Sequence, residues 1–233
     1  MDSETAQVAV DDGVFDCLLA RPASSGPAPV IIVLQEIFGV NPGIRSIADH
    51  YAANGYLALC PDLFWRRERN LSMSESNPDH AERGFALYNA YDFDRGVDDI
   101  AAAIALARTL PDGSGKVGIT GYCLGGLLTF LAAARTDADA FAAYYGGGTE
   151  RFVERAATIR APLLYHLAEE DEYIGPDARR AIVTALEPVP SATVFTYPGF
   201  HHAFARPGGA HYDAASATLA NDRTDRFFAK TLR

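Results

Sequence analysis

A regular alternation of short apolar runs with amphipathic stretches is the feature that most restricts the fold of this 233-residue chain. Residues 30–34 (VIIVL) are uninterrupted by polar side chains, which is typical of a strand buried on both faces. Residues 44–54 instead have apolar side chains at helical spacing and stop at Gly55, a common residue after a helix C-terminus. Because strand–helix–strand crossovers join parallel strands, the alternation predicts an α/β fold with a mostly parallel central sheet and helices on both faces.

The same patterns predict the other elements. Strands are expected at residues 14–19, 56–60, 117–120, 141–145, 163–167 and 193–197, the first of them antiparallel. Helices are expected at residues 125–135, 178–186 and 212–232, and from about residue 83 to 110 with an interruption near Asp92. Residues 62–82 are polar and break the alternation, so they are interpreted as a loop or lid segment. The chain shows no repeat or linker, which predicts a single domain over residues 1–233.

Composition excludes several classes of function. The net charge of −10 and the pI of about 5.0 disfavour a nucleic-acid partner, because an acidic surface repels phosphates. The acidic N-terminal segment does not resemble a signal peptide, and no apolar run approaches the ~20 residues of a membrane helix. We therefore expect a cytoplasmic protein with no membrane association, and a monomer rather than an oligomer. The three cysteines form no CxxC pair, which argues against a disulfide framework or a structural zinc site.

Residues 116–126, KVGITGYCLGG, predict a strand, a tight turn and the start of a helix. Gly121, Cys123 and Gly125 fit the pattern G-x-nucleophile-x-G, in which the nucleophile is strained and its flanking glycines let strand and helix pass closely. Free N–H groups at the start of the following helix would favour a thiolate and a developing oxyanion. Cys123 is therefore a candidate nucleophile; a buried structural cysteine or a redox thiol are the alternatives.

A nucleophile of this kind needs an acid and a base that follow it in the chain. Four acidic residues at 169–172 come after the strand predicted at 163–167, and Asp171 is favoured among them by its position. His201 and His202 follow the last predicted strand, and their spacing does not distinguish which is the base. The remaining histidines are interpreted as structural: His50, His80, His166 and His211.

The loop QEIFG follows the buried strand at residues 30–34 and is expected to line the mouth of the same site. One of its backbone N–H groups would complete an oxyanion hole. Glu36 is an unusual residue to face an oxyanion. A carboxylate placed there could hydrogen-bond the Cys123 thiol or accept its proton.

Six motifs spread over almost the whole chain resemble the dienelactone hydrolase family. They are QEIFGVN (35–41), CPDLF (60–64), GKVGITGYCLGG (115–126), YYGGG (144–148), EEDEYIGP (169–176) and GFHHAFAR (199–206). A cysteine at the nucleophile position together with QEIFG separates this family from the serine hydrolases. The resemblance implies an α/β-hydrolase fold and a carboxylic ester hydrolase of the carboxymethylenebutenolidase type.

By analogy with this family, Cys123 would be the nucleophile, His202 the base and Asp171 the residue that orients it. The resemblance also implies that Glu36 holds the resting thiol and takes its proton when substrate binds. The backbone N–H groups of Ile37 and Leu124 would form the oxyanion hole. The expected substrate-binding residues are Arg206, which would pair with a substrate carboxylate, and Arg83, Phe38, Phe85, Tyr144 and Phe204.

The chain departs from the family pattern in the expected substrate pocket. A second arginine of the family falls on Ala81 here, and Arg83 is the nearest candidate to replace it. Phe85 stands where an aromatic hydroxyl is expected, and Tyr88 stands in place of a tryptophan. These differences leave the catalytic set intact and alter the part that selects the substrate.

The function that the resemblance implies is hydrolysis of a carboxylated unsaturated lactone, dienelactone to maleylacetate, in the breakdown of chloroaromatic compounds or catechols. The reaction would pass through a thioester and would need no metal and no cofactor; adjacent histidines in a loop point apart, so His201 and His202 do not suggest a metal site. A thiol esterase of the same fold acting on another small ester is one alternative. A non-enzymatic carboxylate-binding or redox-sensing protein is the other.

Overall fold

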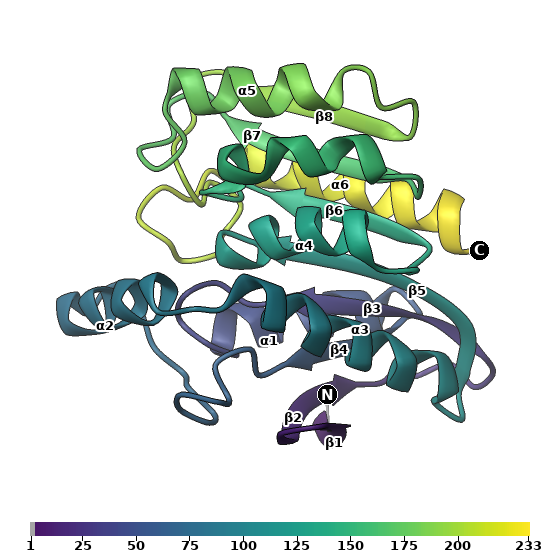
Figure 1. The fold of residues 1–233 in the computed structure, drawn as a ribbon. Helices are drawn as coiled ribbons and strands as arrows, with labels where there is room; N and C mark the ends of the chain where they lie inside the picture. The colour runs from purple at the N-terminus through teal and green to yellow at the C-terminus, as the bar shows by residue number, and fades with distance from the viewer. Residues whose placement is uncertain (1–2) are drawn as a thin grey trace.

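Eight strands form one sheet in the computed structural model of the protein, which describes residues 3–233 (Figure 1). Their order across the sheet is β1-β2-β4-β3-β5-β6-β7-β8. The strands are β1 Ser3–Val10, β2 Gly13–Ala20, β3 Ala28–Leu34, β4 Leu57–Pro61, β5 Gly113–Tyr122, β6 Ala140–Tyr144, β7 Leu163–Ala168 and β8 Ala192–Tyr197. The pairs β1–β2 and β2–β4 are antiparallel, and every other neighbouring pair is parallel. The predicted α/β fold with a mostly parallel sheet is confirmed.

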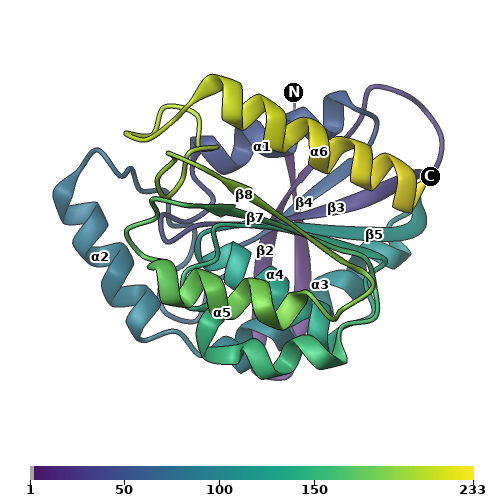
Figure 2. The ribbon, with the colours of Figure 1, turned by 90° about the horizontal axis from the view of Figure 1, so that it is seen from above.

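Helices cover both faces of the sheet, as the alternation predicted. Helices α1 and α6 lie on one face, and α3, α4 and α5 lie on the other (Figure 2). The helices are α1 Pro42–Ala53, α2 Pro78–Asn89, α3 Phe93–Thr109, α4 Leu124–Arg135, the 3-10 helix η1 Thr149–Thr158, α5 Pro176–Leu186 and α6 Ala214–Leu232. None of these helices, within residues 3–233, has both the length and the apolar character required to cross a lipid bilayer.

The centre of the sheet is apolar on both faces because helices cover it from both sides. Every residue of β3, β4, β6 and β7 is buried. Helix α4 is buried over residues 124–133, so it is apolar all round rather than amphipathic. A core of this kind holds the carboxyl ends of the parallel strands rigidly, and functional loops of α/β sheets lie at that edge.

The segment before α3 differs from the sequence prediction. Helix α2 begins at Pro78, whereas a helix was expected to begin at about Arg83, so the loop after β4 ends near Asn77. The side chain of Asn77 caps the helix by accepting a hydrogen bond from the N–H of Asp79, and Pro78 occupies its first turn. The Asn-Pro pair was therefore a helix start within a stretch interpreted as loop. The predicted interruption near Asp92 is confirmed, because Asp92 caps α3 by accepting from the N–H of Arg95.

Strand β1 was missed by the sequence analysis. It pairs with β2 along its whole length, with Ser3 opposite Ala20 and Val10 opposite Gly13. Its sequence, SETAQVAV, is too polar to stand out as a strand, because it lies at the edge of the sheet. The pairing extends the antiparallel part of the sheet by one strand.

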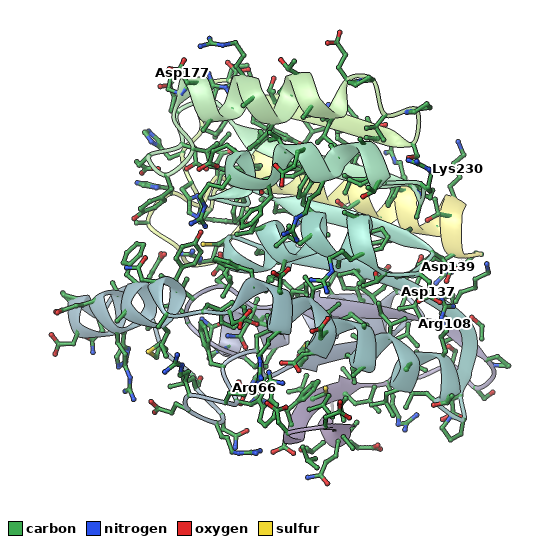
Figure 3. The ribbon with its side chains drawn as sticks, in the orientation of Figure 1. Arg66, Arg108, Asp137, Asp139, Asp177 and Lys230 are labelled. Carbon is green, nitrogen blue, oxygen red and sulfur yellow. The ribbon has the colours of Figure 1, made fainter. Side chains whose placement is uncertain are left out.

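Charged side chains join the amino ends of the central strands to the end of α3. Arg108 donates to Asp139 over 3.2 Å and lies 3.5 Å from Asp137, and Figure 3 shows the three side chains together. The backbone N–H of Val117 in β5 donates to the same oxygen of Asp139 over 2.9 Å. Structural ion pairs therefore occupy the amino ends of the central strands. The functional site is expected at the opposite, carboxyl ends of these strands.

Candidate active site

The turn between β5 and α4 holds Cys123 in a strained backbone conformation. Its φ of 55° and ψ of −114° place a non-glycine residue in a region that L-amino acids rarely adopt. A Cβ atom at Gly121 would lie 2.1 Å from the carbonyl oxygen of Gly125, and one at Gly125 would lie 2.4 Å from that of Leu34. Both flanking glycines are therefore required for β3, β5 and α4 to approach one another here.

His202 and Asp171 form a buried hydrogen-bonded pair. Nδ1 of His202 lies 2.9 Å from Oδ2 of Asp171, and we assign the proton to Nδ1 because a carboxylate only accepts. Oδ1 of Asp171 accepts from the backbone N–H groups of Tyr173 (2.9 Å) and Ile174 (3.1 Å), which fixes the carboxylate. The geometry leaves Nε2 of His202 to act on a substrate or thiol: within residues 3–233 this buried atom has no hydrogen-bond partner.

Charge at Cys123 decides the protonation of His202. Burial alone would lower the pKa of His202, but a negative charge on Cys123 and the hydrogen bond to Asp171 outweigh it and raise the pKa to about 10. A thiolate at residue 123, once formed, would therefore be stabilised by an imidazolium at residue 202. This pairing is the electrostatic arrangement expected of an activated cysteine.

Glu36 is paired with Arg206 rather than with the cysteine. The guanidinium donates from Nε to Oε2 over 2.6 Å and from Nη2 to Oε1 over 2.8 Å, and both side chains are largely buried. Arg206 also pairs with Glu75 through Nη1. Within residues 3–233, no hydrogen bond joins Glu36 to Cys123, so the role of Glu36 in holding the resting thiol stays a prediction.

Two backbone N–H groups are available beside the cysteine. Leu124 is the first residue of α4, so its N–H has no partner within the helix. Ile37 lies in the turn after β3 and contributes to the same cavity as Cys123. Within residues 3–233, neither N–H donates to another protein group, as an oxyanion hole requires.

A cavity of about 770 Å³ opens in front of Cys123. Its walls come from the turn after β3, the loop before α2, α2 itself, the start of η1 and the loops after β7 and β8. Phe38, Phe85 and Arg206 line it, as predicted, and so does Ala81. The volume lies within the range of small-molecule sites, and the lining is mainly apolar with a few charged groups.

A family model described as the dienelactone hydrolase family matches residues 15–232. The chain belongs to this family. A dienelactone hydrolase family member with this nucleophile turn, His–Asp pair and cavity is a hydrolase. The non-enzymatic alternative is therefore set aside.

Sequence relatives of this dienelactone hydrolase family member carry consistent names. A protein of Azospirillum brasilense, provisionally named a carboxymethylenebutenolidase, is 44% identical over 223 residues, which cover 95% of this chain and 96% of that one. The carboxymethylenebutenolidase of Pseudomonas putida is 37% identical over 219 residues, which cover 94% of this chain and 92% of that one. A solved structure from Klebsiella pneumoniae, provisionally assigned as a dienelactone hydrolase, is 28% identical with a TM-score of 0.86 and covers 98% of both chains.

Three residues expected to bind substrate lie elsewhere. Tyr144 is fully buried in β6, where its hydroxyl lies 2.6 Å from that of Thr224. Phe204 is also fully buried and packs on Tyr197, so both aromatic rings belong to the core rather than to the cavity wall. Arg83 is half exposed and pairs with Glu68. It is not among the residues that line the cavity, whereas Ala81 is, so it does not replace the arginine missing at residue 81.

Two tyrosines that the sequence analysis did not select pack against the histidine of the site. The ring of Tyr145 meets that of His202 edge-on with centroids 5.1 Å apart, and Tyr173 does so at 4.8 Å. Tyr145 is the neighbour of the residue that was selected, and its backbone φ of 36° turns it out of the strand register. Burial and the negative charge of Glu36 raise the pKa of Tyr145 well above its usual range, so its phenol stays neutral.

A second cluster of potential ligands borders the cavity. Glu172, His201 and His211 bring their ligand atoms within 4.8 Å of one another, and all three side chains are exposed. His211 was interpreted as structural, but it lines the cavity together with Glu172. Sequence spacing could not reveal this cluster, because its members come from two loops that only the fold brings together.

Proposed function

We propose that this hydrolase opens a small unsaturated lactone that bears a carboxylate, converting a dienelactone to maleylacetate through a thioester at Cys123. The strained cysteine facing Nε2 of a buried His202–Asp171 pair is the observation that carries the proposal. The names of the relatives at 37% and 44% identity support the same reaction. The reaction would belong to chloroaromatic or catechol breakdown in the cytoplasm.

Acylation uses the thiolate as nucleophile. Cys123 attacks the ring carbonyl, and the N–H groups of Ile37 and Leu124 donate to the oxyanion that develops. The ring C–O bond then breaks, the carbonyl re-forms as a thioester, and an enolate leaves. The enolate takes up a proton and becomes the ketone of the product. The conjugated leaving group makes this step possible with little acid assistance.

Deacylation uses His202 as a base. Neutral His202 removes a proton from a water molecule, whose oxygen attacks the thioester, and Asp171 stabilises the imidazolium that results. The C–S bond breaks and leaves a thiolate beside the imidazolium, the state that the raised pKa of His202 favours. Return of that proton to sulfur restores the thiol and completes the addition of one water to the lactone.

The ion pair of Glu36 with Arg206 provides a way to couple this chemistry to substrate binding. A substrate carboxylate can replace the Glu36 carboxylate on the bidentate guanidinium of Arg206. Glu36 is then free to accept the thiol proton of Cys123, which creates the thiolate only when a carboxylated ligand is present. Without such a ligand, both oxygens of Glu36 remain engaged by Arg206.

Arg151 is a further candidate for anion recognition. It lines the cavity, donates from Nη2 to the hydroxyl of Tyr88 over 2.9 Å, and has no carboxylate partner within residues 3–233. Its guanidinium lies over the ring of Phe93, 5.3 Å from the centroid, which limits its movement. We propose that Arg151 provides the second positive charge that Ala81 does not.

Steady-state assays with cis- and trans-dienelactone, with p-nitrophenyl esters as comparison, test the proposal. We expect hydrolysis of at least one dienelactone, no activity in Cys123→Ala or His202→Ala, and a transient mass increase on Cys123 by intact-mass spectrometry. Retained activity in either variant, with a folded protein by circular dichroism, would rule out the assigned nucleophile or base.

The role of the carboxylate is tested separately with Arg206→Ala and Arg151→Ala. Each change should lower kcat/KM for carboxylated lactones much more than for neutral p-nitrophenyl esters, because only the former contain a group for arginine to bind. Equal losses on both substrate types would remove the proposed recognition role of that arginine.

A second candidate is hydrolysis of another small ester by the same catalytic set. Ala81 and Phe85 line the cavity where the family places an arginine and an aromatic hydroxyl, so the part of the pocket that selects the substrate is altered. Activity on a panel of neutral esters that exceeds activity on both dienelactones would favour this candidate.

A further inference from the structure

Three side chains at the rim of the cavity are arranged as a ligand set for a metal ion. Glu172 comes from the loop between β7 and α5, and His201 and His211 come from the loop between β8 and α6. Oε1 of Glu172 lies 3.2 Å from Nδ1 of His211 and 3.7 Å from Nδ1 of His201. We propose that these three residues bind a divalent transition-metal ion such as Zn²⁺.

The spacing of the three atoms suits a tetrahedral ion. Bonds of about 2.0–2.2 Å to nitrogen and oxygen place neighbouring ligand atoms of a tetrahedral zinc roughly 3.3 Å apart. The two distances from Oε1 of Glu172, 3.2 and 3.7 Å, are already close to that separation. The imidazole rings of His201 and His211 lie side by side, tilted by 35° with 4.8 Å between centroids, and the ligand atoms of the three residues lie within 4.8 Å of one another, so small rotations bring both Nδ1 atoms onto one ion.

The carboxylate is held in a position that leaves one oxygen for the ion. Oε2 of Glu172 accepts a hydrogen bond from the backbone N–H of His202 over 3.1 Å, and Oε1 faces the two imidazoles. A partner that fixes the free end of a ligand is the usual support of a metal site. Two imidazoles and one carboxylate are the ligand types that zinc accepts, and a fourth position stays open for water.

Metal binding requires a change of tautomer at His211. In the structure its Nδ1 lies 3.3 Å from the carbonyl oxygen of His202, where an N–H at Nδ1 would donate. Binding of the ion moves that proton to Nε2, which needs no protein partner because the side chain is 42% exposed. The change of tautomer costs one weak hydrogen bond, and a metal–nitrogen bond contributes more free energy than that bond does. The chain's net charge of −10 also favours the approach of a cation.

The ion would link the two loops that carry the acid and the base of the site. Glu172 is adjacent to Asp171 in the chain, and His201 is adjacent to His202. A metal that binds only the folded protein also raises its thermal stability in proportion to the logarithm of metal concentration. The metal is proposed to act on these loops and not as a reactant, so the inference does not rest on the proposed function.

Titration of tag-free, chelator-treated protein with Zn²⁺ and Co²⁺ tests the site. We expect one ion per chain by calorimetry, and a Co²⁺ spectrum with the visible absorption of a low-coordinate ion but without the near-ultraviolet thiolate band that Cys123 would cause. The variants His201→Ala, His211→Ala and Glu172→Gln should each weaken metal binding more than about tenfold. In metal sites, loss of a residue that only hydrogen-bonds a ligand already costs about that much in affinity, and these variants lose a ligand itself. Glu172→Gln keeps an acceptor for the His202 N–H.

Two controls separate this site from other ligands. His50→Ala removes a histidine that pairs with Asp225 on α6, and Cys123→Ser removes the thiol; both should bind Zn²⁺ as the wild type does. Loss of binding in Cys123→Ser, unchanged binding in the three rim variants, or no binding to the wild type would each overturn the proposal.

Discussion

Cys123 occupies the position where the backbone of the site is most constrained. It follows β5 directly, precedes the first residue of α4, and has a positive φ that a residue with a side chain adopts only under constraint from its surroundings. The constraint comes from close contacts of Gly121 and Gly125 with neighbouring backbone, and it presents the sulfur to His202. At this scale, the reactivity of one thiol depends on two residues that have no side chain.

Gly125→Ala should unfold more easily than the wild type. The added Cβ would meet the carbonyl oxygens of Leu34 at 2.4 Å and Gln35 at 2.8 Å, which are backbone atoms of the sheet and cannot rotate away. Overpacking of this kind costs about 1–3 kcal/mol, more than the ~1 kcal/mol that alanine gains over glycine in a helix. We expect a lower urea midpoint by circular dichroism.

Gly175→Ala is the matched control, because Gly175 has a φ of −57° and no atom within 4 Å of an added Cβ. Its stability should stay the same or rise slightly. Equal effects of the two changes would show that close packing at Gly125 is not the cause.

Asp171→Asn should lose about 10²–10⁴-fold in kcat while the protein remains as stable as the wild type. The amide keeps an oxygen for the N–H groups of Tyr173 and Ile174, so the loop is preserved. Its NH₂ group, however, donates to Nδ1 of His202 and moves the ring proton to Nε2, which then cannot accept a proton. Stopped-flow or steady-state assays with a p-nitrophenyl ester measure the change, and near-normal kcat would contradict the orienting role.

His166 connects three elements of the core. Its Nδ1 lies 2.7 Å from the hydroxyl of Tyr197 at the end of β8, and its Nε2 lies 3.0 Å from the hydroxyl of Thr224 on α6. The histidine itself belongs to β7, so one imidazole joins two strands and a helix. Its sequence interpretation as a structural residue agrees with this position.

Acid should destabilise the protein through His166. Burial, with a smaller effect of Arg223, lowers its pKa from 6.5 to about 3. Between these values the unfolded chain binds a proton that the folded chain does not, so stability falls as pH drops from 6.5 towards 3. At pH 4 the loss amounts to about 3 kcal/mol.

His166→Gln removes this titration and should reduce the difference between the unfolding free energies at pH 7 and pH 4, although the variant is less stable at pH 7. Urea unfolding at both pH values measures the difference. A difference as large as that of the wild type would assign the acid sensitivity to other groups.

At the scale of the whole molecule, the cavity is assembled from segments far apart in the chain. The pairing of Arg206 with Glu36 and Glu75 joins the loop after β8, the turn after β3 and the loop before α2. The fold places these segments at the carboxyl ends of parallel strands, where α/β sheets usually bind ligands. Substrate selection is therefore a property of the assembled molecule and not of one motif.

We predict that the protein is a monomer. Among residues 3–233, the large exposed apolar side chains are Val14, Phe85, Tyr173, Tyr212 and Leu219; Phe85 and Tyr173 contact each other at the cavity mouth. Scattered exposed residues do not make the continuous apolar patch that a stable interface requires, and a charge of −10 repels a second copy. Light scattering after size exclusion should give a mass close to 25.1 kDa, and a mass of twice that value would contradict the prediction.

The sequence by itself determined most of the strand–helix order and the nucleophile turn around Cys123, because these depend on local periodicity and on residues a few positions apart. The choice of Asp171 and His202 over their neighbours came from the resemblance to the family and not from spacing. It did not determine the start of α2 or the polar edge strand β1, whose signals were short or weak. It also could not separate Tyr144, which faces the core, from Tyr145, whose positive φ turns it towards His202.

Only the tertiary structure decided that Glu36 pairs with Arg206, that Arg83 pairs with Glu68 while Arg151 lines the cavity, and that Glu172 meets His201 and His211. These contacts join segments that lie tens of residues or more apart in the chain. Their distances depend on how the loops at the end of the sheet pack together, which no local pattern of residues encodes.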